Sequence, residues 1–244
     1  MMNTTWIIAR KESAQMLRSQ RGMVWLLTFS GLLSAFSLLL VSNTELSLLD
    51  NAQVVYMMAG TVMAAGALLA AILGSDAYAG EKERGTLVPL LCAPIAPNAL
   101  LAAWGVMFMT CVPYLWAVGA SGQNLGPALF YLALFGTPVV LGFGYLTMAL
   151  SARTGSVMTS LLTTVTLLML SASPLLIGPG LRGTVVGRAL DAVNPFAGAL
   201  NTFDSVIIDS EPFSVQTARL FLVAAWLGLC LLVARRSAGR PDFQ

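Results

Sequence analysis

Six stretches of mostly apolar residues, each close to the length of a membrane-spanning helix, follow one another along the chain. They lie at residues 22–41, 54–74, 99–118, 127–150, 156–177 and 213–234. About 20 helical residues cross a hydrocarbon core of about 30 Å. The pattern therefore predicts an all-α polytopic membrane protein with six transmembrane helices. No composition change marks a domain boundary, so we expect one transmembrane domain over residues 1–244.

Two further segments have apolar residues at helical spacing. In residues 1–21, four basic side chains lie beside an apolar face, which predicts an interfacial helix along the membrane surface. In residues 178–212, apolar residues recur at three- and four-residue steps, and Asn194-Pro195 breaks the pattern midway. This segment predicts one or two short re-entrant helices in the outer leaflet, with a plain amphipathic surface helix as the alternative.

The most polar segment, residues 76–97, separates the second stretch from the third. Its charged residues are Asp76, Glu81, Lys82, Glu83 and Arg84. A charge at the centre of a bilayer costs roughly 2.5–3.5 kcal/mol, so this segment must lie outside the hydrocarbon. Gly85-Thr86 predicts a turn and a helix start, and the leucines that follow have helical spacing. We expect a short charged helix on one face of the membrane.

The basic residues indicate which face this is. With both termini and residues 76–97 on the cytoplasmic side, ten of the 13 Lys and Arg residues lie inside. Arg182, Arg188 and Arg219 are the three left outside. Cytoplasmic loops of membrane proteins carry an excess of Lys and Arg, so this orientation is the expected one.

Composition supports the membrane class and excludes several kinds of chemistry. The chain is 57% hydrophobic and 10% charged, whereas a soluble domain is about 25% charged. It has no histidine, which excludes Ser-His hydrolases and His-ligated metal sites. Its three cysteines have no metal-binding spacing, so we expect them to serve packing.

The sequence also limits how the chain could obtain energy for transport. The chain has no phosphate-binding loop of the Gly-x-x-x-x-Gly-Lys-Ser/Thr type, so any ATP-driven activity must come from another chain. The first five apolar stretches have no Asp, Glu, Lys, Arg or His in their interior. Ion-coupled carriers normally keep such a residue at mid-membrane, so a proton- or sodium-driven carrier is disfavoured.

The charged segment carries a recognisable motif. Glu81-Lys82-Glu83-Arg84-Gly85-Thr86-Leu87, followed by Leu90-Leu91 and Pro94-Ile95, resembles the cytoplasmic signature of type-2 ABC transporter permeases. Val88-Pro89 depart from it, because family members usually carry an acidic residue there. An ordinary charged loop is the alternative interpretation. The resemblance implies a coupling helix that docks into an ATPase subunit and is formed by Glu81, Glu83, Arg84, Gly85, Thr86, Leu87, Leu90 and Leu91.

The resemblance also implies the rest of the assembly. The chain would be the permease subunit of an exporter in a bacterial inner membrane, and residues 1–21 would be the family's elbow helix. It would not be an enzyme and would bind no cofactor, since ATP and Mg²⁺ would be held by the ATPase. Its partners would be that ATPase, a second copy of the chain, the lipid bilayer and, in some assemblies, a periplasmic accessory protein, but no nucleic acid.

Two stripes within the apolar stretches are candidate sites. In the fifth stretch, Ser156, Thr159, Thr163 and Thr166 share one helix face and would form a weakly polar wall of a translocation path. Alternatively, these hydroxyls bond carbonyls of their own helix or join neighbouring helices.

The second candidate site is a line of small residues in the second stretch. Gly66, Ala70 and Gly74 recur at four-residue steps, which lets helices approach closely in lipid. A six-span permease would need a second copy, so we expect a dimer seam there, with packing inside one subunit as the alternative.

Two other functions stay open on the sequence. One is a membrane-embedded enzyme that modifies lipids, although no pair of carboxylates lies within the apolar stretches to support it. The other is a structural membrane subunit that transports nothing.

Overall fold

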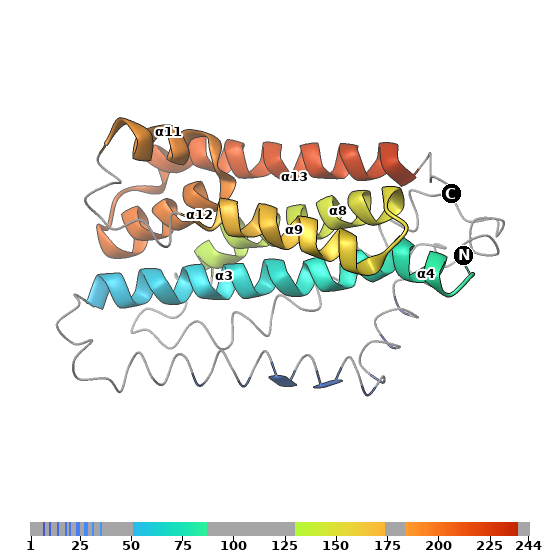
Figure 1. Ribbon diagram of the computed structural model, residues 1–244. Coiled ribbons are helices and arrows are strands. Elements are labelled where there is room, and N and C mark those ends of the chain that lie inside the picture. Colours follow the sequence, from blue (N-terminus) through green and yellow to red (C-terminus); the bar gives the residue numbers. More distant parts are fainter. Residues whose placement is uncertain are drawn as a thin grey trace.

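A computed structural model describes residues 51–86, 130–173 and 184–238, together with isolated helical positions between residues 7 and 35. Every regular element in these ranges is a helix (Figure 1). The α-helices are α3 (Asn51–Ser75), α4 (Glu81–Glu83), α8 (Thr137–Arg153), α9 (Val157–Ser171), α11 (Val185–Val193), α12 (Pro195–Phe203) and α13 (Thr217–Ala238). The π-helices are η2 (Asp76–Gly80), η3 (Leu132–Gly136) and η5 (Asp204–Ile208), and η6 (Phe213–Gln216) is a 3-10 helix. The all-α class is confirmed.

Among the described residues, three continuous helices are long and apolar enough to cross a membrane. They are Ala59–Glu83, Leu134–Arg153 and Phe213–Ala238, and they match the second, fourth and sixth apolar stretches. Helix α9, in the fifth stretch, is apolar but has only 15 residues. The stretches at 22–41 and 99–118 and the expected elbow helix at 1–21 lie outside the described residues, apart from isolated positions.

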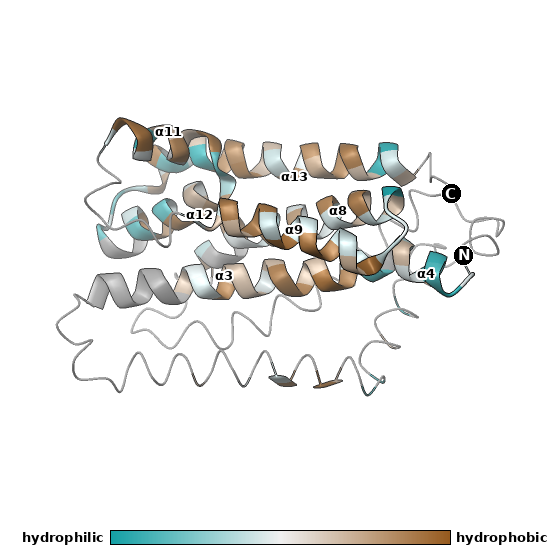
Figure 2. Ribbon diagram, in the orientation of Figure 1, coloured by the Kyte–Doolittle hydropathy of each residue, from teal (hydrophilic) through white to brown (hydrophobic). Residues whose placement is uncertain are grey.

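Helices α3, α8 and α13 run in the same direction, and α9 runs back against them (Figure 1). Met63, in the middle of α3, and Phe135, in η3 just before α8, belong to one core cluster. Further along the same direction, Tyr78 N–H of η2 donates to Ser151 Oγ near the end of α8. We call the end of the bundle that holds residues 76–86 the α4 end, and the opposite end the α11 end. Figure 2 shows apolar residues along α8, α9 and α13 and hydrophilic residues at α4.

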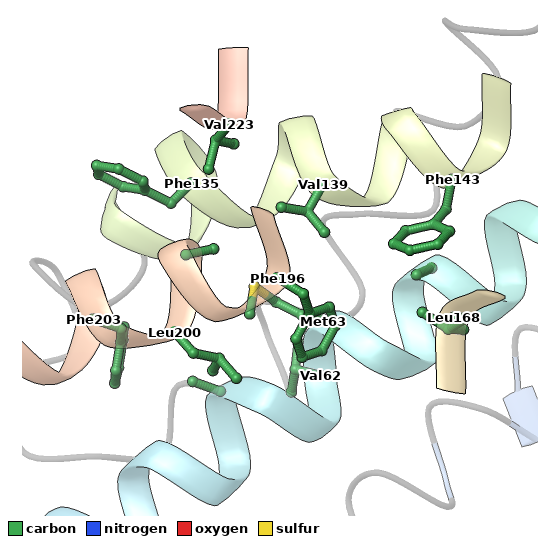
Figure 3. Packing of buried hydrophobic residues seen from close by; sticks show 13 residues of the cluster. Val62, Met63, Phe135, Val139, Phe143, Leu168, Phe196, Leu200, Phe203 and Val223 are labelled. Atoms are coloured by element: carbon green, nitrogen blue, oxygen red, sulfur yellow. The ribbon is translucent and has the colours of Figure 1, made fainter. Parts of the chain in front are cut away.

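Helix α12 fills the core at the α11 end. It is buried along nearly its whole length and contacts α3, α8, α9 and α13. Its Phe196, Leu200 and Phe203 pack with Met63 of α3 and Val139 of α8 (Figure 3). The expected break at Asn194-Pro195 is confirmed, because α11 ends and α12 begins there. A short apolar helix can turn back into the bundle at this point because other helices surround it.

Small residues bring α3 and α8 together. A β-carbon at Gly74 would lie only 2.8 Å from Gly144 O and 3.1 Å from Thr147 Cβ. Ala70, which is 1% exposed, packs against Val140 of α8. Gly66 is buried as well. The expected dimer seam at Gly66, Ala70 and Gly74 is therefore reassigned: these residues serve packing inside one subunit, because their surface is already covered by it.

We predict that Gly74→Ala destabilises the single subunit. The added methyl group meets a backbone oxygen, and overpacking of this kind costs typically about 1–3 kcal/mol. Gly228→Ala, in the interior of α13, is the matched control, because nothing lies within 4 Å of its β-carbon position. Alanine at that site is expected to stabilise slightly, by about 0.5–1 kcal/mol. Thermal unfolding of both variants in detergent checks this, and equal melting temperatures would contradict the reassignment.

Candidate functional site

The candidate site begins where the long apolar helix Ala59–Glu83 leaves the bundle. The helix continues from α3 through η2 and α4 as far as Glu83. Gly85 then has φ = +69°, Thr86 N–H donates to Glu81 O (2.9 Å), and Gly85 N–H donates to Lys82 O (3.0 Å). This is the Schellman arrangement, and it favours glycine at the position with positive φ.

This geometry corrects one expectation. Gly85-Thr86 ends the helix that precedes it, and the short helix expected to start at these residues lies outside the described residues. The charges of residues 76–83 belong to the end of the spanning helix rather than to a separate surface helix. The motif Glu-Lys-Glu-Arg-Gly-Thr is therefore a helix-stop sequence at this site. Leu87, Leu90 and Leu91 lie outside the described residues.

A serine of α8 completes the hydrogen bonding of the π-helical turn. Ser151 Oγ accepts from Tyr78 N (3.1 Å) and Ala79 N (2.8 Å) and donates to Ser75 O (2.8 Å). Ser151 is fully buried, so these bonds form away from water. An unpaired backbone group in such a place costs about 1–3 kcal/mol. Ser151 thus holds the widened turn of one helix against the end of another.

Beyond this turn, four polar side chains hold the end of the helix in shape. Arg84 Nη2 lies 2.9 Å from both carboxylate oxygens of Asp76, and its Nη1 donates to Glu81 Oε1 (3.3 Å). Thr86 Oγ1 donates to Glu81 Oε2. Gly80 leaves room for the Asp76 carboxylate, which a β-carbon would strike. The hydrogen bond and charge of Asp76 raise the pKa of Arg84. The Arg84 and Asp76 side chains are about half exposed (52% and 50%), so this pair contributes little stability, about 0–1 kcal/mol.

Lys82 and Glu83 point the other way, onto the turn that joins α8 to α9. Lys82 Nζ donates to Ala152 O and Thr154 O, both at 3.3 Å. Glu83 Oε1 accepts from Val157 N at 2.9 Å. We call these two residues the clip. The cation lies at the carbonyl end of α8 and the anion at the amide end of α9, where each offsets the partial charge of the helix end.

Glu83 of the clip supplies the capping hydrogen bond that the α8–α9 turn lacks at the start of α9. Ser156 is the N-cap residue of α9, but its side chain makes no capping hydrogen bond. Glu83, from a distant part of the chain, takes over that role. A charge at an exposed helix end is worth typically 0.3–1 kcal/mol. The contribution to stability is small, but the position of α4 relative to α8 and α9 is well defined.

The expected site residues are thus partly brought together. Glu81, Glu83, Arg84, Gly85 and Thr86 lie together at one helix end. Their side-chain contacts among the described residues are within the chain, however, and were not evident from the sequence. Sequence reasoning also missed Ser151 and the role of Lys82. Both act across more than 65 residues of chain, and no local pattern marks such partners.

The hydroxyl stripe of α9 faces out of the subunit. Thr159, Thr163 and Thr166 are exposed, and Ser156 is half-buried at the start of the helix. Thr163 Oγ1 donates to Thr159 O (2.8 Å) and Thr166 Oγ1 to Leu162 O (2.9 Å), as the alternative interpretation required. Any path that this stripe lines would therefore lie outside the single subunit.

At the α11 end, Asn194 joins two helices. Its Oδ1 accepts from Phe196 N (3.0 Å) and caps the start of α12. Its Nδ2 donates to Ser171 O (2.7 Å), at the end of α9. One side chain therefore satisfies backbone groups of both helix ends.

Arg219 organises the start of α13. Its Nη1 donates to Gln216 Oε1 (2.7 Å) and Ser205 Oγ (3.3 Å), and Gln216 Nε2 donates to Glu211 Oε2 (2.9 Å). The one charge near the start of this spanning helix is thus held by polar side chains of η5 and η6.

No protein-family model matches the sequence, and no curated protein matches it either. Function therefore has to be inferred from the residues and their arrangement.

We predict that Ser151→Ala loosens the π-helical turn. Tyr78 N–H and Ala79 N–H lose their buried acceptor, which costs about 1–3 kcal/mol. Amide hydrogen exchange of residues 75–80 should be faster than in the wild type, and the melting temperature should fall. Ser156→Ala is the matched control, since that side chain makes no capping bond, and it should change neither quantity. Unchanged exchange in Ser151→Ala would mean that the turn does not depend on this serine.

Proposed function

We propose that the chain is the permease subunit of an ATP-binding cassette transporter, which forms a homodimer and exports a substrate with energy from a separate ATPase subunit. One observation carries the proposal. The part of the permease-like motif that the structure describes continues one long apolar helix and is hydrogen-bonded to the ends of α8 and α9. A protein that docks on this segment would act on three helices of the bundle at once.

The directions of the helices support a six-span topology. Helices α3, α8 and α13 correspond to the second, fourth and sixth spans and run the same way, and α9, the fifth, runs back (Figure 1). Successive spans cross a membrane in opposite directions, so the even-numbered spans of such a protein must run one way and the fifth span the other. In the proposal, the α4 end is cytoplasmic, because Lys82, Arg84, Arg153, Arg235 and Arg236 belong to helix ends on that side. The proposal places the chain in the inner membrane of a bacterium, as the resemblance to type-2 permeases implies.

The proposed translocation path lies between two subunits. Because the threonines of α9 face outward and the glycine line of α3 faces inward, the path can be lined by α9 but cannot involve Gly66, Ala70 or Gly74. Threonine hydroxyls that bond their own helix leave a mildly polar, uncharged surface. Such a wall suits an amphiphilic cargo better than an ion.

Thiol labelling tests the orientation. In a background without Cys92, Cys111 and Cys230, we expect a membrane-impermeant maleimide to label Asp209→Cys in intact cells. Arg236→Cys should react only after the membrane is permeabilised. Both side chains are exposed, and they belong to segments at opposite ends of the bundle. A difference in labelling would therefore report the side of the membrane and not burial within the protein. The reverse labelling pattern would overturn the topology.

Copurification tests the function. The tagged chain, purified from its native membrane, should carry a subunit with a phosphate-binding loop and should hydrolyse ATP. Leu90→Asp should weaken that association at least about tenfold, because a buried leucine is worth about 1.5–3 kcal/mol and tenfold corresponds to 1.4 kcal/mol. Leu90→Met, which stays apolar, is the control. A wild-type preparation without an ATPase, or a fully active Leu90→Asp complex, would contradict the proposal.

A further inference from the structure

The turn between α8 and α9 brings opposite helix ends side by side. The carbonyl end of α8 has partial negative charge, and the amide end of α9 has partial positive charge. The two residues of the clip are adjacent in sequence, and each lies on the helix end of opposite charge. The order Lys82-Glu83 is therefore matched to the direction of the two helices, and the reverse order would be mismatched.

The two helices that the clip holds differ in how firmly they are packed. Helix α8 is buried on several sides, with Val139, Phe143, Met148 and Ala152 all less than 1% exposed. Helix α9 buries only one line of residues, Ser160, Thr164 and Leu168. Against α8, the packed line of α9 includes one buried hydrogen bond, from Ser160 Oγ to Thr147 O (3.3 Å), which a shift of α9 would have to break. Close-packed elements move as rigid bodies. A displacement of α4 would therefore move α9 relative to α8.

At its other end, α9 is tied to the buried helix α12. Asn194 Nδ2 donates to the last carbonyl of α9, that of Ser171, while Asn194 Oδ1 caps α12. A shift of α9 along its axis would pull on Asn194 and so on the start of α12. The two ends of α9 are thus held by single side chains that come from α4 and from the α11–α12 junction.

We propose that Lys82 and Glu83 are positioning residues that pass the movement of residues 76–86 to α9, and that Asn194 passes it on to α12. This inference rests on the proposed function, because it takes an ATPase docked on that segment as the source of movement. The resemblance placed Glu83 among the residues that dock into the ATPase, but its carboxylate is engaged by Val157 N–H, so we reassign it. Lys82 and Glu83 then act inside the permease and do not bind the ATPase.

The first test uses the permease alone. The double variant Lys82→Glu with Glu83→Lys keeps the composition and net charge but places each charge at the wrong helix end. Amide exchange at Val157 should become roughly two- to fivefold faster. The single variant Glu83→Gln keeps an acceptor oxygen, so exchange at Val157 should stay slower than in Glu83→Ala, which has no acceptor. Arg153→Gln, which removes an exposed charge of the same turn, is the control and should leave exchange unchanged.

The second test uses the complex with the ATPase. Spin labels at Leu162→Cys on α9 and Leu229→Cys on α13, both exposed, report the distance between these helices. We expect ATP to shift this distance in the otherwise wild-type complex. In the charge-swapped variant, the ATPase should still bind and hydrolyse ATP, but the shift should be lost. In Asn194→Ala, the shift on α9 should persist, while the ATP-dependent change in amide exchange of α12 should disappear.

The outcomes separate the two proposals. If the wild type captures no ATPase, the proposed function fails and this inference fails with it. If the ATPase binds and hydrolyses ATP but α9 does not move, only the inference fails. If the charge swap releases the ATPase, Lys82 or Glu83 binds that subunit directly, and their assignment as positioning residues is wrong.

Discussion

Helices α3 and α8 approach closely because small residues line the surfaces that face each other. At Gly74 there is no space for a side chain before Gly144 and Thr147. This approach places Ser151 beside the π-helical turn of η2, where its hydroxyl reaches three backbone groups. The other contacts at the α4 end depend on this approach, because Lys82 and Glu83 reach the α8–α9 turn only if η2 and α8 are in contact.

Backbone groups at helix ends determine where the other elements lie. A helix leaves several amide and carbonyl groups unpaired at each end, and in an apolar bundle few waters are present to pair them. Here Lys82, Glu83 and Asn194 pair such groups from distant parts of the chain, and Ser151 pairs the amides of the π-helical turn in the same way. Each bond contributes modestly to the free energy of unfolding, since the net value of a hydrogen bond is about 0.5–1.5 kcal/mol. Together they determine which helix ends stay in contact.

This arrangement changes the interpretation of the charged motif. Its charges hold a helix end in shape and attach it to the bundle, so a docked partner would meet a preorganised surface. In the proposed assembly, affinity would come from apolar residues of the motif, and the charges would keep the docked segment rigid. Buried apolar anchors generally carry binding energy, whereas exposed charges mainly affect orientation and the rate of encounter.

The sequence by itself determined the helical class, three helices long and apolar enough to cross a membrane, and the break at Asn194-Pro195, because periodicity, length and proline act locally along the chain. It also located the turn at Gly85, but not that this turn ends the helix before it. Only the tertiary structure decided between the two interpretations of Gly74 and of the α9 hydroxyls, and only it found the partners of Ser151 and Glu83. Helical spacing shows which residues share a face, but the neighbour of that face belongs to a distant part of the chain. That neighbour is set by packing, which no local pattern records.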